Sequence, residues 1–440
     1  MTPSAREHDL VLFGATGFVG RLLAAYLAEH APPGTRIALA GRRRAALEEV
    51  RAGLPAAAQA WPLVAADSGD SASLAAMAGS ARVVVSTVGP YLRHGLPLVE
   101  ACARAGTHYA DLTGEVPFVR AAADRYDAVA RASGARIVHA CGYDSVPSDL
   151  AVLLLHRRCT ADDAGTLRTV RTVATARGGV SGGTVASMRG IAELSLRSRS
   201  VRRLLADPFS LSPDRGAEPD VPQPPDAPLP RRGRDGRWTT PFVMASFNSR
   251  VVRRSNALQG WAYGRTLRYG EVMGVGSGPR GAVLAAGISA GLAVGLGLVA
   301  AASATAPTRA LLDRVLPGPG TGPDAATRER GWFRMTVDAT TTHGRRYRAV
   351  AGGPGDPGYA ATAVMLGEAG LALALDEPHL PDRAGSLTPA SGLGDVLVDR
   401  LRAAGHLYDV AERKRPTLSA ARESTRAERT VGGGHPADVR

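Results

Sequence analysis

Three glycines, Gly14, Gly17 and Gly20, stand three residues apart in the stretch DLVLFGATGFVGRLL. Residues 10–13 form an unbroken apolar run, which is typical of a parallel strand buried on both faces, and apolar residues recur at helical spacing from Phe18 onward. At such a turn, glycine lets the backbone approach a pyrophosphate, and the free amide groups of the helix N-terminus attract phosphate. The pattern predicts a dinucleotide-binding turn. The alternative interpretation is a tight strand-to-helix turn without a ligand.

The end of the next predicted strand indicates which dinucleotide is bound. In RIALAGRRR, the strand ends at Gly41, which leaves room for the adenine ribose, and Arg42 and Arg43 follow. A site specific for NAD usually has a carboxylate here that binds the ribose 2′-hydroxyl, whereas guanidinium groups bind a 2′-phosphate through charge-assisted hydrogen bonds. We therefore predict NADP(H) and not NAD(H). The alternative, that the arginines only solvate the start of the next helix, could hold for Arg44 alone.

A third strand end completes the predicted cofactor site. In VVVSTVGPY, a strand ends at Thr87 and a Gly89-Pro90 turn follows. Ligands of open α/β sheets bind beyond the carboxyl ends of the strands, so this turn should lie beside the glycine turn. The residues predicted to contact the cofactor are Gly14, Thr16, Gly17, Phe18, Val19, Gly20, Gly41, Arg42, Arg43, Thr87, Val88, Gly89 and Pro90.

The composition of the chain limits the classes of partner and the compartment. The 440 residues carry a formal net charge of +13, and Lys414 is the only lysine, which favours phosphate-bearing cofactors or an anionic membrane surface. Nucleic acid is not an expected partner, because the arginines are dispersed and no zinc-finger or RNA-recognition signature accompanies them. The three cysteines and ten histidines show no disulfide framework and no metal-ligand spacing, so we expect no metal. A polar opening, MTPSAREHD, and sparse cysteines predict a cytoplasmic protein without a signal peptide.

The chain divides into regions with different patterns. Strands and helices alternate over residues 1–150, which predicts an α/β fold with a Rossmann-type, doubly wound parallel sheet. Residues 151–355 should form a second domain, since TLRTVRTVATAR alternates like a half-exposed strand and GWFRMTVDATTTHGRRYRAVAGG like a hairpin. Within it, residues 213–237 are rich in proline and charge and should form a mobile surface loop. Residues 356–411 contain two patterns of amphipathic helices, and residues 412–440 should form a disordered tail.

Residues 281–308 form an uncharged segment between Arg280 and Arg309. As one helix, the segment would exceed the roughly 30 Å of a bilayer core. Alanine and glycine outnumber the larger apolar residues, however, and both flanks must lie on one side of a membrane if they complete the same domains. We therefore predict a surface-lying or re-entrant pair of helices that makes the protein peripheral at the inner face of the plasma membrane. The alternative is a buried core hairpin.

Taken together, these motifs resemble the saccharopine dehydrogenase-like oxidoreductases, and within them the trans-acting enoyl reductases that serve polyketide synthases in cell-envelope lipid synthesis. The resemblance lies in GATGFVG, AGRRR, VGPY with GLPLVEACARAGTHYADLTGE, CGYDSVPSD, SGGTVAS, DPGYAATAVML and TPASGLGDVLVDRLRAAG, and it runs from about residue 9 to 410. It implies an inserted second α+β domain, C-terminal helices that return to the Rossmann domain, and NADP(H)-linked reduction. It also implies an acyl or polyketide lipid substrate, either free or held on a carrier protein or synthase. A homodimer is compatible with the sequence.

The glycine spacing alone also fits short-chain dehydrogenases, but their chemistry is excluded. That mechanism needs a tyrosine and a lysine one helical turn apart, and no tyrosine precedes Lys414 at this spacing.

Candidate catalytic residues follow from the chemistry that the resemblance implies. Reduction of a conjugated C=C needs a hydride at the β-carbon, a proton at the α-carbon and hydrogen bonds to the thioester oxygen. Tyr91 follows one predicted strand end, and Tyr143 and Asp144 follow another. We predict Tyr91 or Tyr143 as the proton or hydrogen-bond donor, with Asp144 equally placed. Alternatively, Tyr91 packs beneath the nicotinamide and Tyr143 is a core residue.

Other polar residues at the strand ends have open roles. Asp111 and Glu115 either orient the ribose or cap the following helix, and Asp149 is predicted to be a cap or an anchor. The loop at residues 181–184 is predicted to line the substrate cleft.

Two rival functions follow from the same motifs. In the first, the protein reduces an imine between an amino acid and a keto acid, which would require a cluster of inward arginines for several carboxylates. In the second, it binds NADP(H) without turnover and acts as a membrane-associated scaffold.

Overall fold

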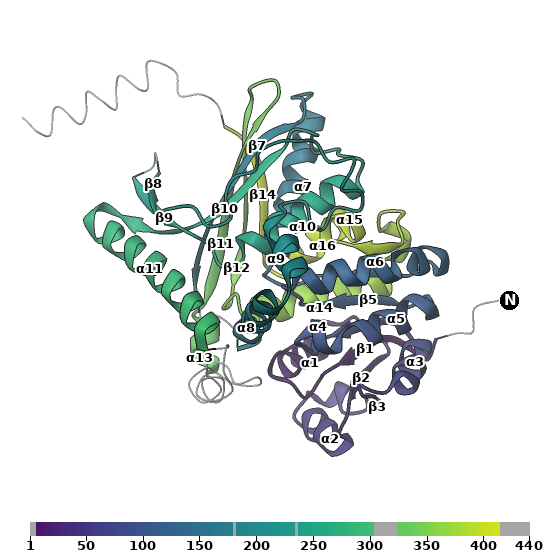
Figure 1. Ribbon diagram of the computed structural model, residues 1–440. Helices are drawn as coiled ribbons and strands as arrows, with labels where there is room; N and C mark the ends of the chain where they lie inside the picture. The colour runs from purple at the N-terminus through teal and green to yellow at the C-terminus, as the bar shows by residue number, and fades with distance from the viewer. Residues whose placement is uncertain (1–5, 179–181, 234–235, 303–323, 414–440) are drawn as a thin grey trace, which may run out of the picture.

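The strands of the N-terminal region assemble into a parallel sheet of seven strands (Figure 1). The computed structural model describes residues 6–178, 182–233, 236–302 and 324–413. The sheet order, β3-β2-β1-β4-β5-β6-β13, begins with the strand order of a doubly wound dinucleotide-binding fold. Its strands are β1 (His8–Phe13), β2 (Ile37–Gly41), β3 (Leu63–Ala65), β4 (Ala81–Ser86), β5 (His108–Asp111), β6 (Arg136–Val138) and β13 (Gly385–Leu387). The predicted α/β fold class is confirmed.

Helices cover this sheet, so that its central strands are buried. All six residues of β1 are buried, which explains why the strand is a continuous apolar run and does not alternate. The helices between the strands are α1 (Phe18–His30), α2 (Arg44–Ala52), α3 (Ser71–Ser80), α4 (Tyr91–His94), α5 (Leu96–Ala105) and α6 (Val116–Ser133), with a short 3₁₀ helix at Ala56–Ala58.

A helix from the C-terminal region, α14 (Ala360–Leu375), completes the first unit. It packs against α1, β1, β4 and β5, and it is buried on nearly all sides. A Cβ at Gly370 would lie 2.7 Å from Val85 and 2.9 Å from Leu10, so glycine allows a close approach to the sheet. The prediction of an amphipathic helix is wrong here, because α14 lies between the sheet and α16 (Gly394–Ala403).

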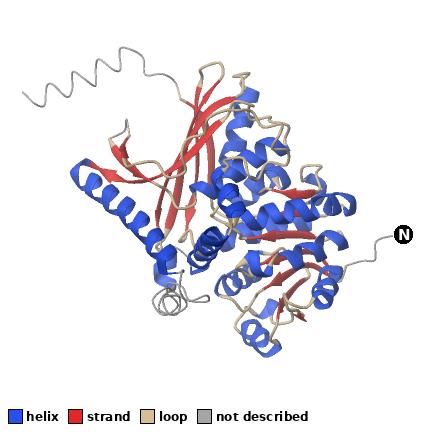
Figure 2. Ribbon diagram, in the orientation of Figure 1, coloured by secondary structure: helices blue, strands red, loops and turns tan. Residues whose placement is uncertain are grey.

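The second unit is a mixed sheet of seven strands, ordered β14-β12-β11-β7-β10-β9-β8. The β11–β12 pair forms the predicted hairpin, and β7 pairs in parallel with β10. In Figure 2, most helices of this unit lie on one side of the long strands, and one long helix, α11 (Gly278–Ala302), lies on the other side, next to β9 and β10. The strands are β7 (Leu167–Arg177), β8 (Arg231–Arg232), β9 (Arg237–Thr240), β10 (Arg268–Ser277), β11 (Trp332–Thr341), β12 (Arg346–Pro354) and β14 (Leu407–Glu412). The helices are α7 (Val146–Ala161), α8 (Gly182–Arg197), α9 (Arg199–Ala206), α10 (Ala245–Leu258), α11 (Gly278–Ala302) and α13 (Ala325–Glu329).

The C-terminal region contributes to both sheets. After α14 come a short 3₁₀ helix (Glu377–His379), β13, which pairs with β6, and α15 (Pro389–Gly392), while β14 pairs with β12 at the edge of the second sheet. The chain therefore crosses back to the first unit and then returns to the second, which the helical patterns did not indicate. The predicted disordered tail, residues 412–440, lies almost entirely outside the described residues.

Two buried arginines on α10 hold the proline-rich segment in place. Arg250 donates to Asp226 at 2.8 Å, and Arg253 donates to Gln223 at 3.2 Å. Burial lowers the pKa of Arg253 and of Arg254 to about 10. The sequence predicts a mobile loop at residues 213–237, whereas the described part of that segment supplies acceptors that buried guanidinium groups require.

The uncharged segment at residues 281–308 is described only up to its residue 302, within α11. Two large apolar side chains are exposed on α11, Val283 at 75% and Leu284 at 49%. Among the described residues, no helix combines the length and the hydropathy required to cross a bilayer. Peripheral membrane contact through this segment stays a prediction.

Replacing Arg254 with leucine should destabilise the fold. Its guanidinium donates to the carbonyl of Leu211 and to the carbonyl of Ser386 in β13, both at 2.6 Å, and so joins the two units. Loss of these donors leaves two buried carbonyls unpaired, and we expect the free energy of unfolding to fall by about 2–4 kcal/mol in urea titrations. Replacing the exposed Arg199 with leucine should change the free energy of unfolding by no more than about 0.5 kcal/mol. Equal effects would contradict this role for Arg254.

Candidate cofactor and active site

The glycines shape the turn between β1 and α1. Gly14 has a φ of +91°, and a Cβ there would lie 2.7 Å from Oγ1 of Thr87. A Cβ at Gly20 would lie 2.1 Å from the carbonyl oxygen of Gly14, so only glycine lets α1 pack this closely on the turn. A Cβ at Gly17 would meet only that carbonyl, at 3.3 Å, so the backbone there remains accessible. These are the three roles that glycine has in a dinucleotide-binding turn: tight turn, approach of phosphate and helix packing.

A cavity of about 960 Å³ opens at the carboxyl ends of β1, β2 and β4. Every residue that the sequence predicts to contact the cofactor lines this cavity. They are Gly14, Thr16, Gly17, Phe18, Val19, Gly20, Gly41, Arg42, Arg43, Thr87, Val88, Gly89 and Pro90.

The arginines after β2 differ in their surroundings. Arg42 and Arg43 are exposed at the cavity, and no described carboxylate lies within ion-pair distance of either. Arg44, the first residue of α2, forms an ion pair with Glu48 at 3.2 Å one helical turn later. This separates two arginines that could bind a phosphate from one that belongs to the helix surface.

The opposite wall comes from parts of the chain that the cofactor motifs did not include. It is formed by α8, by the segment that leads into α10, and by the residues before α14. Large side chains on this wall belong to Met188, Ile191, Phe242, Met244, Phe247 and Tyr359. Most resemble ordinary core residues in the sequence, and only Tyr359 lies in a motif of the family resemblance, DPGYAATAVML.

The predicted cleft loop at residues 181–184 leads into this wall. Ser181 lies outside the described residues, and Gly182 begins α8. The N–H group of Gly182 donates to the hydroxyl of Tyr359 at 3.0 Å. The rings of Tyr359 and Phe18 pack in a T-shaped arrangement, with their centroids 4.7 Å apart. These contacts join α8 to the glycine turn across the cavity.

Tyr91 lines the cavity, but its hydroxyl is already used. The hydroxyl donates to the carbonyl of Ser86 at 3.0 Å and accepts from the N–H of Leu112 at 3.2 Å. Burial raises the pKa of Tyr91 well above its ordinary value. The geometry favours a packing role for the ring over proton donation.

Tyr143 lies behind the cavity and does not line it. Its ring packs edgewise on Phe333, at 5.2 Å between centroids, and on Phe242, at 6.4 Å. Burial raises the pKa of its hydroxyl. This position matches the alternative interpretation of Tyr143 as a core residue.

Asp144, the third predicted catalytic candidate, lines the cavity. No hydrogen bond to its carboxyl group is found among the described residues. Burial therefore raises the pKa of Asp144 to about 7, since nothing compensates the charged form. A substantial fraction of the group is therefore protonated near neutral pH, and the residue lines the cavity where a ligand can reach it.

The remaining carboxylates at the strand ends have structural partners. Asp111 accepts from the N–H of Ala140 at 3.0 Å and contacts Nδ1 of His139 at 2.7 Å. Glu115 accepts from the N–H groups of Tyr91 and Leu92, at 3.0 and 2.8 Å, so it caps α4 and not its own helix.

Asp149 shows how a buried carboxyl group is compensated. It accepts from Ser255 at 2.6 Å and from the N–H of Ala390, at the start of α15, at 2.8 Å. Burial raises its pKa to about 7 as well, yet it lies outside the cavity. Asp149 is thus an anchor between α7, α10 and α15.

In the described part of the chain, no group of three or more histidine, cysteine, aspartate or glutamate residues could hold a metal ion.

Comparisons with known proteins agree with this geometry. A model of the saccharopine dehydrogenase NADP-binding domain matches residues 10–138. A protein of Mycobacterium tuberculosis, named as a candidate trans-acting enoyl reductase, is 52% identical over 415 residues, which are 92% of this chain and 98% of that protein. A protein of Mycobacterium bovis named trans-acting enoyl reductase is 48% identical over 413 residues, with the same coverage. This chain belongs to the trans-acting enoyl reductase family.

The architecture of this family member is shared with a solved structure. The apo saccharopine dehydrogenase (L-Glu forming) of Saccharomyces cerevisiae superposes with a TM-score of 0.53 over 92% of this chain and 99% of that one, at 14% identity. This likeness concerns the fold alone. The NADP-binding domain model and the named relatives make the protein an NADP-dependent oxidoreductase, and the predicted cofactor NADP(H) is confirmed.

The cavity of this family member fits the cofactor. The accessible backbone at Gly17 and the N-terminus of α1 would hold the pyrophosphate, and Arg42 with Arg43 would hold the 2′-phosphate. We propose these assignments on the space above the glycine turn and on the unpaired arginines.

Replacing both Arg42 and Arg43 by alanine should weaken the binding of NADPH much more than the binding of NADH. Charge-assisted hydrogen bonds contribute roughly 1.5–3 kcal/mol, so the Kd for NADPH should rise about 10- to 100-fold in titration calorimetry. The Kd for NADH should change less than about threefold, because NADH has no 2′-phosphate.

Arg44 provides the matched control. Replacing it with alanine removes a surface ion pair with Glu48 and should leave both Kd values nearly unchanged. If the double variant weakened the binding of NADPH and of NADH equally, the 2′-phosphate assignment would be refuted.

Proposed function

We propose that the protein is an NADPH-dependent enoyl reductase that acts on an acyl thioester of a polyketide or lipid intermediate, presented by a synthase or carrier protein. The observation that carries this proposal is Asp144, a carboxyl group with a pKa of about 7 that lines the cofactor cavity and has no described hydrogen-bond partner. The name of the relatives, trans-acting enoyl reductase, supports the same reaction.

Reduction of the C=C requires two separate deliveries. When bound, NADPH supplies the hydride, which brings two electrons to the β-carbon. The protein must supply one proton to the α-carbon, and the protonated Asp144 holds it at the cavity wall. Tyr91, with its hydroxyl tied to Ser86 and Leu112, supports the floor of the site.

The walls of the cavity suit an acyl chain. Met188, Ile191, Phe242 and Phe247 present apolar side chains opposite the cofactor motifs. Such a wall stabilises a hydrocarbon by removing it from water.

A substrate with several carboxylates would need arginines that are free to bind it. Besides Arg42 and Arg43, one further arginine among the described residues lines the cavity, Arg250. Its guanidinium group already donates hydrogen bonds to Asp226 and to Ser210, at 2.8 and 3.2 Å. The imine-reductase alternative therefore lacks the cluster it requires in this part of the chain.

The reaction can be tested by following NADPH absorbance. We expect oxidation of one NADPH for each crotonyl thioester of N-acetylcysteamine reduced, and none with a mixture of a keto acid and an amino acid. Oxidation only with that mixture would favour imine reduction. No oxidation with either substrate, while NADPH still binds, would favour the non-catalytic scaffold.

Asp144→Asn should lower kcat by about 100-fold, because general acid catalysis contributes roughly 10²–10⁴-fold. NADPH binding should be unchanged. Since the pKa of Asp144 is raised to about 7, its acid form predominates below pH 7, and the wild-type kcat should fall as the pH rises through about 7. The variant should lose this alkaline limb.

Asp149→Asn is the matched control, since the pKa of Asp149 is also raised to about 7 but the residue lies outside the cavity. It should lower stability and keep the alkaline limb. If the limb disappears in Asp149→Asn and persists in Asp144→Asn, the assignment of the proton donor is wrong.

A further inference from the structure

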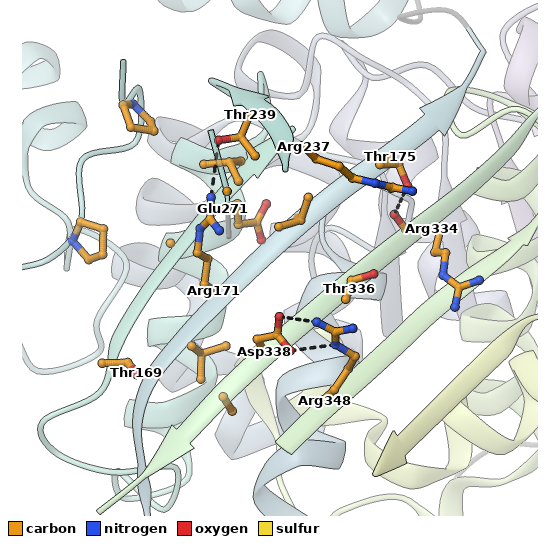
Figure 3. A pocket seen from close by; sticks show the side chains of 18 of the residues that line it. Thr169, Arg171, Thr175, Arg237, Thr239, Glu271, Arg334, Thr336, Asp338 and Arg348 are labelled. Carbon is orange, nitrogen blue, oxygen red and sulfur yellow. Dashed lines mark hydrogen bonds and ion pairs between the residues drawn. The ribbon is translucent and has the colours of Figure 1, made fainter. Parts of the chain in front are cut away.

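The open face of the second sheet is a broad, strongly basic concavity. It encloses about 1740 Å³ across strands β7 to β12 and β14 and lies apart from the cofactor motifs. Nine of the residues that line it are arginines, and two are carboxylates. Figure 3 shows Arg171, Arg237, Arg334 and Arg348, which come from four strands of this sheet, β7, β9, β11 and β12. We call it the arginine face.

The few carboxylates leave the arginine face with a large positive excess. Asp338 bridges to Arg348 at 2.7 Å (Figure 3) and to Arg413 at 3.5 Å. Glu271 is 2% exposed and accepts from buried Tyr269 and Asn248, at 2.5 and 2.9 Å, so it contributes little to the surface.

Several of the arginines are exposed and have no acidic neighbour. Arg268, Arg334 and Arg346 are exposed, and no described carboxylate lies within ion-pair distance of them. They belong to three different strands, β10, β11 and β12, so their charges are spread across the sheet and do not converge on one point. A single small anion cannot engage all of them.

Shape and charge together select the class of partner. A flat lipid surface cannot reach the centre of a concave sheet, whereas a rounded domain can. A second copy of this chain would bring its own arginine face against this one, and like charges at an interface are unfavourable. The complementary partner is a compact protein domain with an acidic surface.

The arginine face ends beside the cofactor cavity. Trp332, 43% exposed, lines the arginine face and pairs with Arg177 and Pro354 at the end of the sheet. The chain after Pro354 reaches Gly358 and Tyr359, which line the cofactor cavity. A domain seated on the arginine face is thus close enough to pass a tethered chain into the active site.

We infer that the arginine face docks the acidic carrier domain that presents the acyl thioester. This inference rests on the proposed function, and it adds the surface and the chemistry through which the partner is recognised. Carboxylates of the carrier domain meet the exposed arginines, so docking is electrostatic and weakens with salt.

The test compares a tethered substrate with a free one. The probes are an acidic acyl carrier domain of a polyketide synthase, loaded with a crotonyl group on phosphopantetheine, and crotonyl-N-acetylcysteamine. In the full-length protein, Arg268→Gln, Arg334→Gln and Arg346→Gln are combined. We expect KM for the carrier-bound substrate to rise about tenfold, and kcat/KM for the free thioester to stay unchanged. Binding of the carrier domain to the wild type should weaken as salt increases.

A charge-matched control removes exposed arginines that line neither cavity, Arg125, Arg199 and Arg203, by the same change to glutamine. This control variant should change neither KM for the carrier-bound substrate nor kcat/KM for the free thioester. Equal effects of the two triple variants, or no binding of the carrier domain to the wild type, would overturn the inference.

Further measurements distinguish the other occupants. Co-sedimentation with vesicles of phosphatidylglycerol and phosphatidylcholine that is lost in the Arg268, Arg334 and Arg346 variant would assign the face to lipid and overturn the inference. A change in oligomeric state of that variant, measured by light scattering, would assign the face to a second copy and do the same. If neither thioester is reduced, the proposed function fails, while carrier binding to wild type and variant still decides the docking.

Discussion

The active site depends on the close contact between α1 and the turn that precedes it. The carbonyl oxygen of Gly14 occupies the space that any side chain at position 20 would need, since a Cβ there would lie 2.1 Å away. With glycine, α1 packs directly on the turn of residues 14–17 that follows β1, and its N-terminus faces the same cavity as the ends of β2 and β4. If α1 shifted, the glycine backbone, the arginines after β2 and the Thr87–Pro90 turn would no longer surround one cavity.

The second constraint is how buried carboxyl groups are compensated. Asp111 and Glu115 receive backbone N–H groups, and Asp149 receives a hydroxyl and an N–H group. These bonds stabilise the strand ends and helix starts that frame the cavity. Asp144 lies in the same region without a described donor, which leaves it as a weak acid beside the cofactor site. A carboxyl group therefore has structural partners at three of these positions and is chemically available at one.

The sequence predicts the local part of this site well. The glycine turn and the arginines after β2 each depend on neighbours along the chain, so spacing and residue type suffice to locate them. The opposite wall cannot be read this way, because Met188, Phe242 and Phe247 come together only when α8 and α10 pack against the first unit. The tyrosine candidates illustrate the same limit. The sequence indicates that Tyr91 follows a strand end, but the hydrogen bonds of its hydroxyl with Ser86 and Leu112 depend on the folded backbone.

The second sheet shows what periodicity detects and what it misses. The hairpin of β11 and β12 was visible from alternation, whereas β14 follows a helix pattern directly. In the first sheet, β13 was missed as well, because it has only three residues. Such short strands form because an existing edge offers unpaired backbone groups, and that edge lies far away in the sequence. The arginine face was likewise hidden, since its residues are dispersed along the chain and gather only through strand pairing.

The position of α14 has a consequence for how the protein is made. Leu10 and Val85 of the central strands are covered by α14, a helix that is synthesised only after the whole of residues 86–359. During translation, which proceeds from the N-terminus, the first five strands leave the ribosome long before their cover does. The nascent nucleotide-binding half must therefore wait with an apolar surface exposed, and it completes its fold only after residues 360–375 have also emerged.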